Sequence, residues 1–303
     1  MSFSERVKDE FLNESFNLDC CVLSFISSLI HTGGSIKIAN KSIGAEIVLR
    51  NDKVLQRLKK LILRRFNVDC QLEGQAQNFY VLKIDACALE ILLQCQILEY
   101  EDNCLQIVEG AAGYLTENEC CKKAYLKGAF LGGGALALPN KSGYSLEFKT
   151  SNEVLAKDLT NLLNYFGFSA NTAFRANSYF VYVKNSEHIS DFLALMQAPC
   201  AVLELQNLIL SREMSNNTNR QNNCIIANAI KNFDTAINQV NNIKLIDQKM
   251  GLKNLAPALF EAANLRLNNP DLSLEELSKL ADISKSGMNH RFRKLKQIAE
   301  SLI

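Results

Sequence analysis

The last twenty residues of the chain combine polar and basic side chains in a pattern that suits contact with DNA. Residues 284–303 contain five Lys or Arg and one acidic residue. Ser, Asn and His can hydrogen-bond to base edges, whereas Lys and Arg bind phosphate groups or guanine. The candidate base contacts are Ser286, Asn289 and His290, and the candidate phosphate or guanine contacts are Lys285, Arg291, Arg293 and Lys294. The alternative is a basic helix face that is only solvated.

Ten cysteines are the other residues with evident chemistry. No two of them have the CxxC spacing of a zinc ribbon or a redox motif. Cys20–Cys21 and Cys120–Cys121 are neighbours in the sequence, which is a poor arrangement for two ligands of one metal ion. We therefore expect buried free thiols, no metal site and no cofactor.

The chain repeats itself, without gaps, at an offset of 100 residues. Cys20–Cys21 matches Cys120–Cys121, and Gly33–Gly34 matches Gly133–Gly134. Further matched positions are Val54 and Leu55 with Val154 and Leu155, Phe66 with Phe166, and Val81 with Val181. Such self-similarity indicates two copies of one structural unit.

Each copy is predicted to have the element order α-β-β-α-β-α. An apolar helix ends at the glycine pair, and strands and amphipathic helices follow it, as judged from hydrophobic periodicity. The segments in chain order are residues 35–39, 45–49, 54–66, 79–84 and 88–94 in the first copy, and 135–138, 144–149, 154–166, 179–183 and 189–196 in the second.

The glycine-ended helices resemble the two interface helices of LAGLIDADG homing endonucleases. The resemblance rests on ISSLIHTGG, residues 26–34, and LKGAFLGGG, residues 126–134. In that family the acidic residue before the final glycine holds the catalytic metal ion, and Mg²⁺ needs such anionic oxygen ligands. Gly33 and Gly133 stand at these positions here. The resemblance thus implies degenerate catalytic positions and no catalytic residue. We interpret His31 as a partly buried polar residue rather than a general base.

Three short helices are predicted near the C-terminus, over residues 258–267, 274–281 and 285–302. Ser273 and Glu276 can form a capping box at the start of the second helix. A tight turn at residues 282–284 precedes the third, basic helix, which is the plan of a helix-turn-helix motif. Along this last helix, four apolar residues fall on one face at about 100° per residue and should pack inward. They are Met288, Phe292, Leu295 and Ala299.

Asparagine is frequent in the segment that precedes these helices, SNNTNRQNNC at residues 215–224. Asn is a poor helix former. The segment is either an exposed hinge or a set of side chains that are paired at a specific surface.

Charge is distributed unevenly along the chain. Residues 1–200 hold 20 Lys and Arg against 22 Asp and Glu, a net of −2, while residues 201–303 hold 13 against 10, a net of +3. A phosphate-binding surface is therefore expected in the C-terminal third. The early uncharged run, residues 20–36, is interrupted by polar residues, which excludes a membrane span. Residues 1–14 lack the apolar core of a secretory signal.

Four segments together resemble the WhiA family of bacterial sporulation and cell-division regulators, and the resemblance spans essentially the whole chain. They are AYLKGAFLGGG at residues 124–134, SNNTNRQNNCIIAN at 215–228, LRLNNPDLSLEEL at 265–277 and SKSGMNHRFRKL at 284–295. The resemblance implies a degenerate LAGLIDADG domain joined to a helix-turn-helix domain. It also implies DNA binding without nuclease activity.

We therefore expect an α+β protein with a tandem-repeat LAGLIDADG-like domain followed by an all-α helix-turn-helix domain. The expected boundaries are residues 1–200 for the repeat domain, with copies at about 15–100 and 115–200, residues 201–254 for a helical linker, and residues 255–303 for the DNA-binding domain.

The expected function is sequence-specific binding of double-stranded DNA by a regulator of transcription, cell division or the chromosome. Such a protein would be cytoplasmic and associated with the nucleoid, not with a membrane. Two alternatives stay open. One is a nucleoid-tethered scaffold whose repeat domain binds a protein partner, and the other is an active LAGLIDADG nuclease. The oligomeric state is left open.

Overall fold

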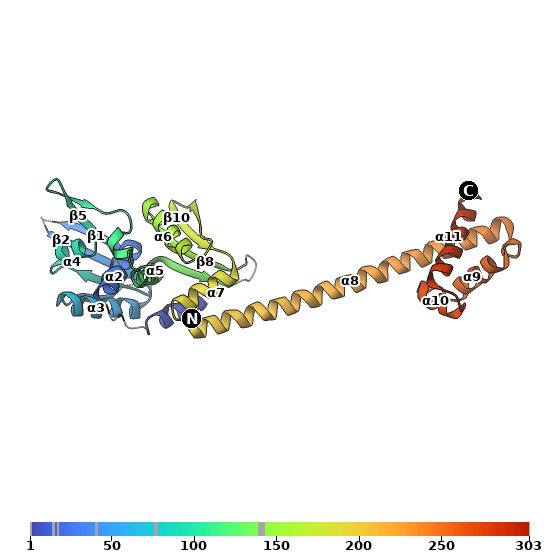
Figure 1. The fold of residues 1–303 in the computed structure, drawn as a ribbon, viewed down its shortest axis with the longest axis horizontal. Coiled ribbons are helices and arrows are strands. Elements are labelled where there is room, and N and C mark those ends of the chain that lie inside the picture. Colours follow the sequence, from blue (N-terminus) through green and yellow to red (C-terminus); the bar gives the residue numbers. More distant parts are fainter. Residues whose placement is uncertain are drawn as a thin grey trace. The chain divides into compact units, whose positions relative to one another are not determined.

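The computed structural model describes residues 2–13, 16, 18–39, 42–75, 78–138 and 143–302. The chain divides into two compact units, residues 1–210 and residues 211–303 (Figure 1). The first unit contains helices and antiparallel sheets, and the second is helical. The α+β fold class predicted from the sequence is confirmed.

The N-terminal unit contains two copies of the same arrangement of helices and strands. The first copy consists of α2 (Asp19–Gly33), β1 (Gly34–Ala39), β2 (Ser42–Leu49), α3 (Asp52–Phe66), β3 (Gln71–Gln75), β4 (Phe79–Ile84) and α4 (Ala88–Gln94). The second consists of α5 (Glu119–Gly133), β7 (Gly134–Ala137), β8 (Ser145–Thr150), α6 (Glu153–Tyr165), β9 (Asn171–Arg175), β10 (Ser178–Val183) and α7 (Ser186–Leu195). Their sheets have the equivalent orders β1-β2-β4-β3 and β7-β8-β10-β9.

Each copy contains one strand more than the sequence pattern predicts. The additional strands, β3 and β9, pair antiparallel with β4 and β10 at an edge of each sheet. Most of their residues are exposed. An edge strand without a buried face has no need for alternating apolar residues, so its sequence carries no strand periodicity.

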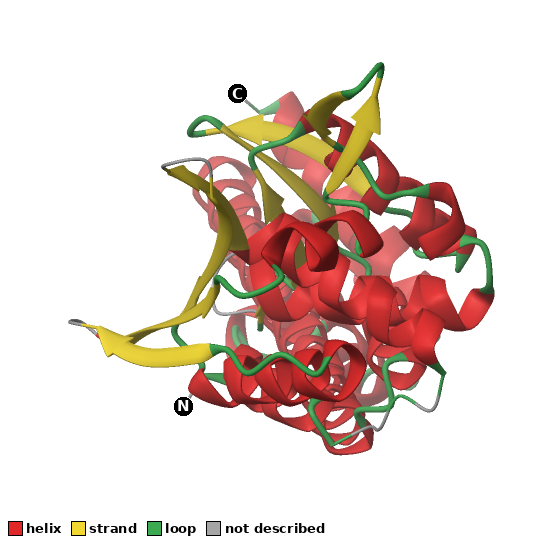
Figure 2. Cartoon of the chain, turned by 90° about the vertical axis from the view of Figure 1, so that its left-hand side faces the viewer, coloured by secondary structure: helices red, strands yellow, loops and turns green. Residues whose placement is uncertain are grey.

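Helices α2 and α5 pack against each other in the middle of the unit. Gly128 makes this approach possible, because a Cβ there would overlap Ser28 Oγ and lie 2.5 Å from the Phe25 carbonyl oxygen. The two helices run parallel, since Cys20 lies near Cys120 at one end and Gly33 lies near Gly132 at the other. The strands gather on one side of the unit and helices lie on the other (Figure 2).

Shorter elements join and close the two copies. The hairpin of β5 (Leu98–Glu101) and β6 (Cys104–Ile107), with the 3₁₀ helix Gly113–Thr116, connects the copies. Helix α1 (Phe3–Phe11) buries three apolar side chains in the same core. Its Glu10 carboxylate accepts hydrogen bonds from the first free main-chain N–H groups of α8 (Pro199–Met250), those of Cys200 at 2.8 Å and Ala201 at 3.0 Å.

The C-terminal unit is built from the distal part of α8 and three short helices. These are α9 (Pro257–Asn268), α10 (Leu274–Leu280) and α11 (Lys285–Ser301). Ile243 and Ile246 of α8 share a core with the inward face of α11. Met288, Phe292, Leu295 and Ala299 are all buried, which confirms the face predicted from their spacing.

The asparagine-rich segment, residues 215–224, is an exposed and unbroken part of α8. The hinge considered from its composition is therefore not a break in secondary structure. Asn is a weak helix former rather than a helix breaker. Hydroxyl groups in the segment bond back to the helix, as when Thr218 Oγ1 donates to the Met214 carbonyl at 2.9 Å.

Among the described residues, no helix combines the length and the apolar character that crossing a membrane requires.

Candidate DNA-binding surface

Local hydrogen bonds fix the start of α10 and the start of α11. The predicted capping box is present, since Glu276 N–H donates to Ser273 Oγ at 3.3 Å and Ser273 N–H donates to Glu276 Oε2 at 2.8 Å. Asp282 has a φ of 49°, in the left-handed region. Ser284 then caps α11 by accepting from Gly287 N–H at 3.1 Å. The frame predicted for a helix-turn-helix is thus formed.

Most of the predicted DNA contacts lie exposed on the face of α11 that points away from its core. No hydrogen bond or ion pair engages these side chains within the described part of the chain. They are Ser286, Asn289, His290, Arg293 and Lys294. Asn289 and Arg293 are four residues apart and therefore neighbours on the helix surface. The arrangement presents hydrogen-bonding and cationic groups together.

Two of the predicted contacts have partners inside the protein. Arg291 is half-buried, and its Nη1 donates to Glu261 Oε2 at 2.8 Å and to the Ala258 carbonyl at 3.3 Å. Lys285 Nζ lies 3.3 Å from Glu275 Oε2, and this hydrogen bond holds the pKa of Glu275 below its usual value. Arg291 therefore ties α11 to α9, and its contact with DNA stays a prediction.

A hollow of about 580 Å³ lies beside the exposed face of α11. Asn289, Arg293 and Lys296 line it from α11. Its other polar walls come from α8, namely Thr235, Asn238, Gln239 and Asn242. This second wall was not predicted from the sequence, although the spacing of its four residues places them on one helical stripe.

Buried Arg266 connects the loop between α9 and α10 to helix α8, which forms one wall of the hollow. Its Nη1 donates to three carbonyl oxygens of the loop between α9 and α10, those of Asn269 at 3.3 Å, Pro270 at 3.3 Å and Leu272 at 2.5 Å. Its Nε donates to Gln239 Oε1 at 2.9 Å. Burial lowers the pKa of this guanidinium. Arg266 follows the buried residues Ala262 and Ala263 of α9 at helical spacing, and this spacing in the sequence could have predicted that Arg266 is buried.

The two glycines predicted to stand at degenerate catalytic positions lie at the ends of the two central helices. Gly33 is the last residue of α2 and Gly133 the last of α5. A Cβ at Gly33 would lie 3.1 Å from Leu49 Cδ2 and 3.4 Å from Gly132 Cα. A Cβ at Gly133 would lie 2.6 Å from the Lys149 carbonyl oxygen. Close packing thus occupies the room that a carboxylate side chain would need at residue 133.

His31 near these glycines is a neutral, hydrogen-bonded group. Its Nε2 lies 3.2 Å from the Val108 carbonyl oxygen, which can only accept, so Nε2 carries the proton. Its Nδ1 then accepts from the Tyr125 hydroxyl at 3.1 Å. Burial lowers the pKa of His31 to about 4. The prediction of a partly buried polar residue is confirmed.

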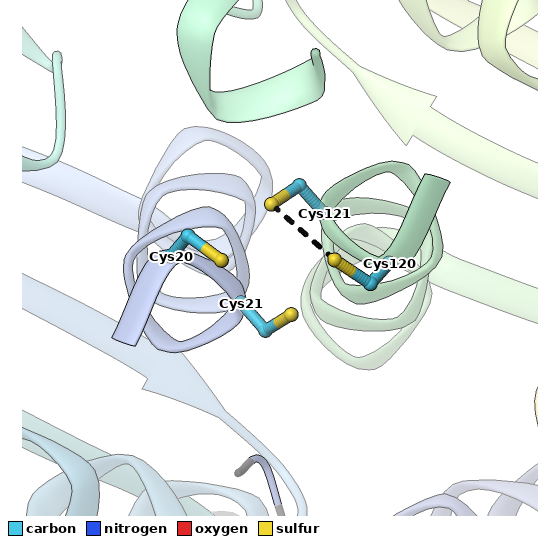
Figure 3. A group of neighbouring side chains, drawn as sticks. All are labelled: Cys20, Cys21, Cys120 and Cys121. Carbon is cyan, nitrogen blue, oxygen red and sulfur yellow. Dashed lines mark hydrogen bonds between the residues drawn. The ribbon is translucent and has the colours of Figure 1, made fainter. Parts of the chain in front are cut away.

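The expectation of buried thiols is correct for Cys21, Cys70, Cys95 and Cys121 and wrong for the other six cysteines, which are exposed. The Sγ atoms of Cys20, Cys21, Cys120 and Cys121 all lie within 4.8 Å of one another (Figure 3). The sequence analysis considered each pair by itself, whereas the packing of α2 on α5 brings the two pairs together.

Comparison with known proteins finds three family domains along the chain. The WhiA N-terminal LAGLIDADG-like domain matches residues 19–98, the WhiA LAGLIDADG-like domain matches residues 122–215, and the WhiA C-terminal HTH domain matches residues 218–299. The chain is 36% identical over 311 residues to "Probable cell division protein WhiA" of Brevibacillus brevis, covering 100% of this chain and 98% of that protein. The chain belongs to the WhiA family.

Other comparisons agree with this family assignment. The WhiA relative from Clostridium acetobutylicum is 34% identical over 313 residues, covering 100% of this chain and 98% of its own length. The crystal structure of full-length DUF199/WhiA from Thermatoga maritima has a TM-score of 0.60 and 23% identity, covering 99% of both chains. At that identity the likeness concerns the fold, which this chain shares with WhiA.

Proposed function

We propose that this WhiA-family chain binds double-stranded DNA through the exposed face of α11 and regulates transcription or cell division without cleaving DNA. The observation that carries the proposal is the helix-turn-helix frame, on which Asn289, Arg293 and Lys294 are exposed and engage no described partner. The relatives named as probable cell division proteins support the regulatory role. Association with the nucleoid would follow from DNA binding.

The order of side chains along α11 suits recognition of a major groove. In helix-turn-helix proteins the N-terminal residues of the second helix contact base edges. Ser286, Asn289 and His290 occupy that part of α11. Arg293 and Lys294 follow one turn later, where cations can bind phosphate groups.

We propose that the chain does not cleave DNA because residues 33 and 133 are both glycine. Metal-assisted phosphodiester cleavage needs carboxylates that hold Mg²⁺ near the scissile phosphate. Glycine supplies no such group, and the close packing at Gly133 supports the same view. The repeat domain would then serve as a scaffold or as a surface for a protein partner.

We propose a functional division close to the one expected from the sequence, with residues 1–200 as repeat domain, 201–254 as linker and 255–303 as reading domain. Ile243 and Ile246 belong to the core under α11. The reading domain would therefore include the last turns of the linker helix.

Binding titrations of α11 variants test this proposal. A preferred duplex is first identified from genome-wide occupancy and is then compared with random DNA at several salt concentrations. Arg293→Ala and Lys294→Ala should weaken binding to both duplexes and lower the salt slope by about one unit for each phosphate group that is no longer bound. Asn289→Ala and His290→Ala should cost about 1–3 kcal/mol on the preferred site and much less on random DNA.

Lys244→Ala is the matched control, because this exposed lysine lies about 200° around α8 from Asn242, away from the hollow. It should leave both titrations unchanged. Equal losses of affinity on specific and random DNA for all four α11 variants would make the helix an electrostatic anchor and favour the scaffold role.

A further inference from the structure

Four thiols meet where the two central helices begin. Cys20 and Cys21 are the second and third residues of α2, and Cys120 and Cys121 hold the same places in α5. Their Sγ atoms all lie within 4.8 Å of one another, and those of Cys120 and Cys121 are 3.9 Å apart (Figure 3). A tetrahedral ion with Zn–S bonds of about 2.3 Å would separate its sulfur ligands by about 3.8 Å. Small side-chain rotations would therefore complete such a site.

The parallel packing of α2 and α5 explains why adjacent cysteines can share one ion. Neighbouring residues of a helix point about 100° apart. Cys21 and Cys121 are buried, whereas Cys20 and Cys120 are exposed. With the two helices side by side, the four sulfur atoms approach one point from different directions (Figure 3). The main-chain N–H groups of both first turns would also favour thiolate ligands there.

A buried lysine beside the cluster would balance part of the charge of bound thiolates. A divalent ion held by four thiolates is a dianion. Lys127 of α5 lines a hollow of about 410 Å³ together with Cys21 and Cys120, while Lys123 in the same hollow is paired with Glu119 at 2.6 Å. Lys127 is buried, and burial lowers its pKa to about 8. A nearby dianion would stabilise the charged form of this lysine.

We propose that Cys20, Cys21, Cys120 and Cys121 form a tetrahedral tetrathiolate site for one Zn²⁺ ion, which cross-links the two repeats. Sulfur-only tetrahedral sites select zinc or iron, and a structural zinc site is closed to further ligands. The short distances between the sulfur atoms suit a single ion better than an iron–sulfur cluster, which spreads its thiolates over several iron atoms.

Binding of the ion is coupled to release of protons. Four thiols lose four protons as four S–Zn bonds form, and no oxidant or reductant is needed. The affinity should therefore fall as the pH is lowered, on the order of tenfold per pH unit for each thiol that is protonated in the metal-free chain.

Cobalt titration of the full-length chain tests the site. The chain is purified under reducing conditions, stripped with a chelator and titrated with Co²⁺, and Zn²⁺ is then added. We expect about one equivalent of Co²⁺ with the charge-transfer and d–d absorption of a tetrahedral thiolate site, and displacement by Zn²⁺. Cys21→Ser/Cys121→Ser should reduce the affinity at least about tenfold. Cys104→Ser/Cys224→Ser, which removes two exposed cysteines elsewhere, should bind as the original chain does.

Cys20→Ser/Cys120→Ser provides a second test at exposed positions, where folding should tolerate the change. Circular dichroism of each metal-free variant shows whether it is folded. The proposal is overturned if the reduced chain takes up no Co²⁺, if the bound ion gives an octahedral spectrum, or if the cluster variants bind as tightly as the control.

Discussion

Buried polar side chains in both units are held by main-chain carbonyl groups. Arg266 donates to three loop carbonyls and to Gln239, and these bonds hold the loop before α10 in place. His31 donates to the Val108 carbonyl and accepts from Tyr125. A buried polar group without such partners would be strongly destabilising. Each residue therefore fixes a loop whose sequence has no regular pattern.

The pKa of His31 predicts a pH dependence of stability. The folded pKa is lowered from 6.5 to about 4, so the unfolded chain binds more protons between these two values. The free energy of unfolding should therefore rise with pH across this window. Relative to His31→Gln, the original chain should lose about 2 kcal/mol when the pH falls from about 7 to about 4.5.

Urea denaturation of both proteins at these two pH values measures the difference. Exposed His290→Gln should follow the original chain. Parallel pH profiles for the original chain and His31→Gln would show that His31 is not held neutral in the fold.

At the scale of elements, close helix packing accounts for the two repeats being joined into one unit. Glycines of α5 that face α2 admit neighbouring backbone and side-chain atoms where any Cβ would overlap them, as at Gly128 and Gly132. Interiors at such density tolerate little added volume. The same packing aligns the starts of α2 and α5, and therefore the four cysteines.

Gly133→Leu tests the close packing at the end of α5. Its Cβ would lie 2.6 Å from the Lys149 carbonyl oxygen, so backbone must shift. We expect the free energy of unfolding to fall by about 1–3 kcal/mol. Gly113→Ala is the matched control, since a Cβ there meets nothing within 4 Å, and it should change stability by less than about 0.5 kcal/mol. A melting temperature that is the same for both variants would contradict the close packing of the end of α5 against β8.

At the scale of the whole molecule, the two units differ in their charge and in the surfaces they present. Residues 1–210 have 20 Lys and Arg against 23 Asp and Glu, a net charge of −3, and residues 211–303 have 13 against 9, a net of +4. Each unit has its own hydrophobic core. Non-specific DNA affinity depends on cations that replace the counterions of phosphate groups. The C-terminal unit should therefore supply most of the affinity.

Separate fragments can test this division of DNA binding. A fragment of residues 211–303 should bind a random duplex at least about tenfold more tightly than a fragment of residues 1–210 at physiological salt. Its affinity should also have the steeper salt dependence. Fluorescence anisotropy of labelled duplexes measures both quantities. Comparable affinities would place a main DNA contact on the repeat unit.

Local patterns in the sequence were enough to predict most helices and several strands of this protein. The spacing of Met288 and Phe292 identified the inward face of α11, and Ser273 with Glu276 marked the start of α10. These features depend on residues within about one or two turns of each other, so a linear pattern records them. The repeat at 100 residues likewise follows from comparing the chain with itself.

Only the tertiary structure decided which distant residues meet. Arg291 forms an ion pair with Glu261, 30 residues away, so a carboxylate of the same chain partly neutralises its charge. Cys20 and Cys120 are separated by 100 residues and still belong to one cluster of thiols. Edge strands β3 and β9 have no buried face and were recognised only by their pairing. Contacts of this kind depend on how helices and sheets pack, and the packing is set by shape and burial across the whole unit rather than by any local spacing.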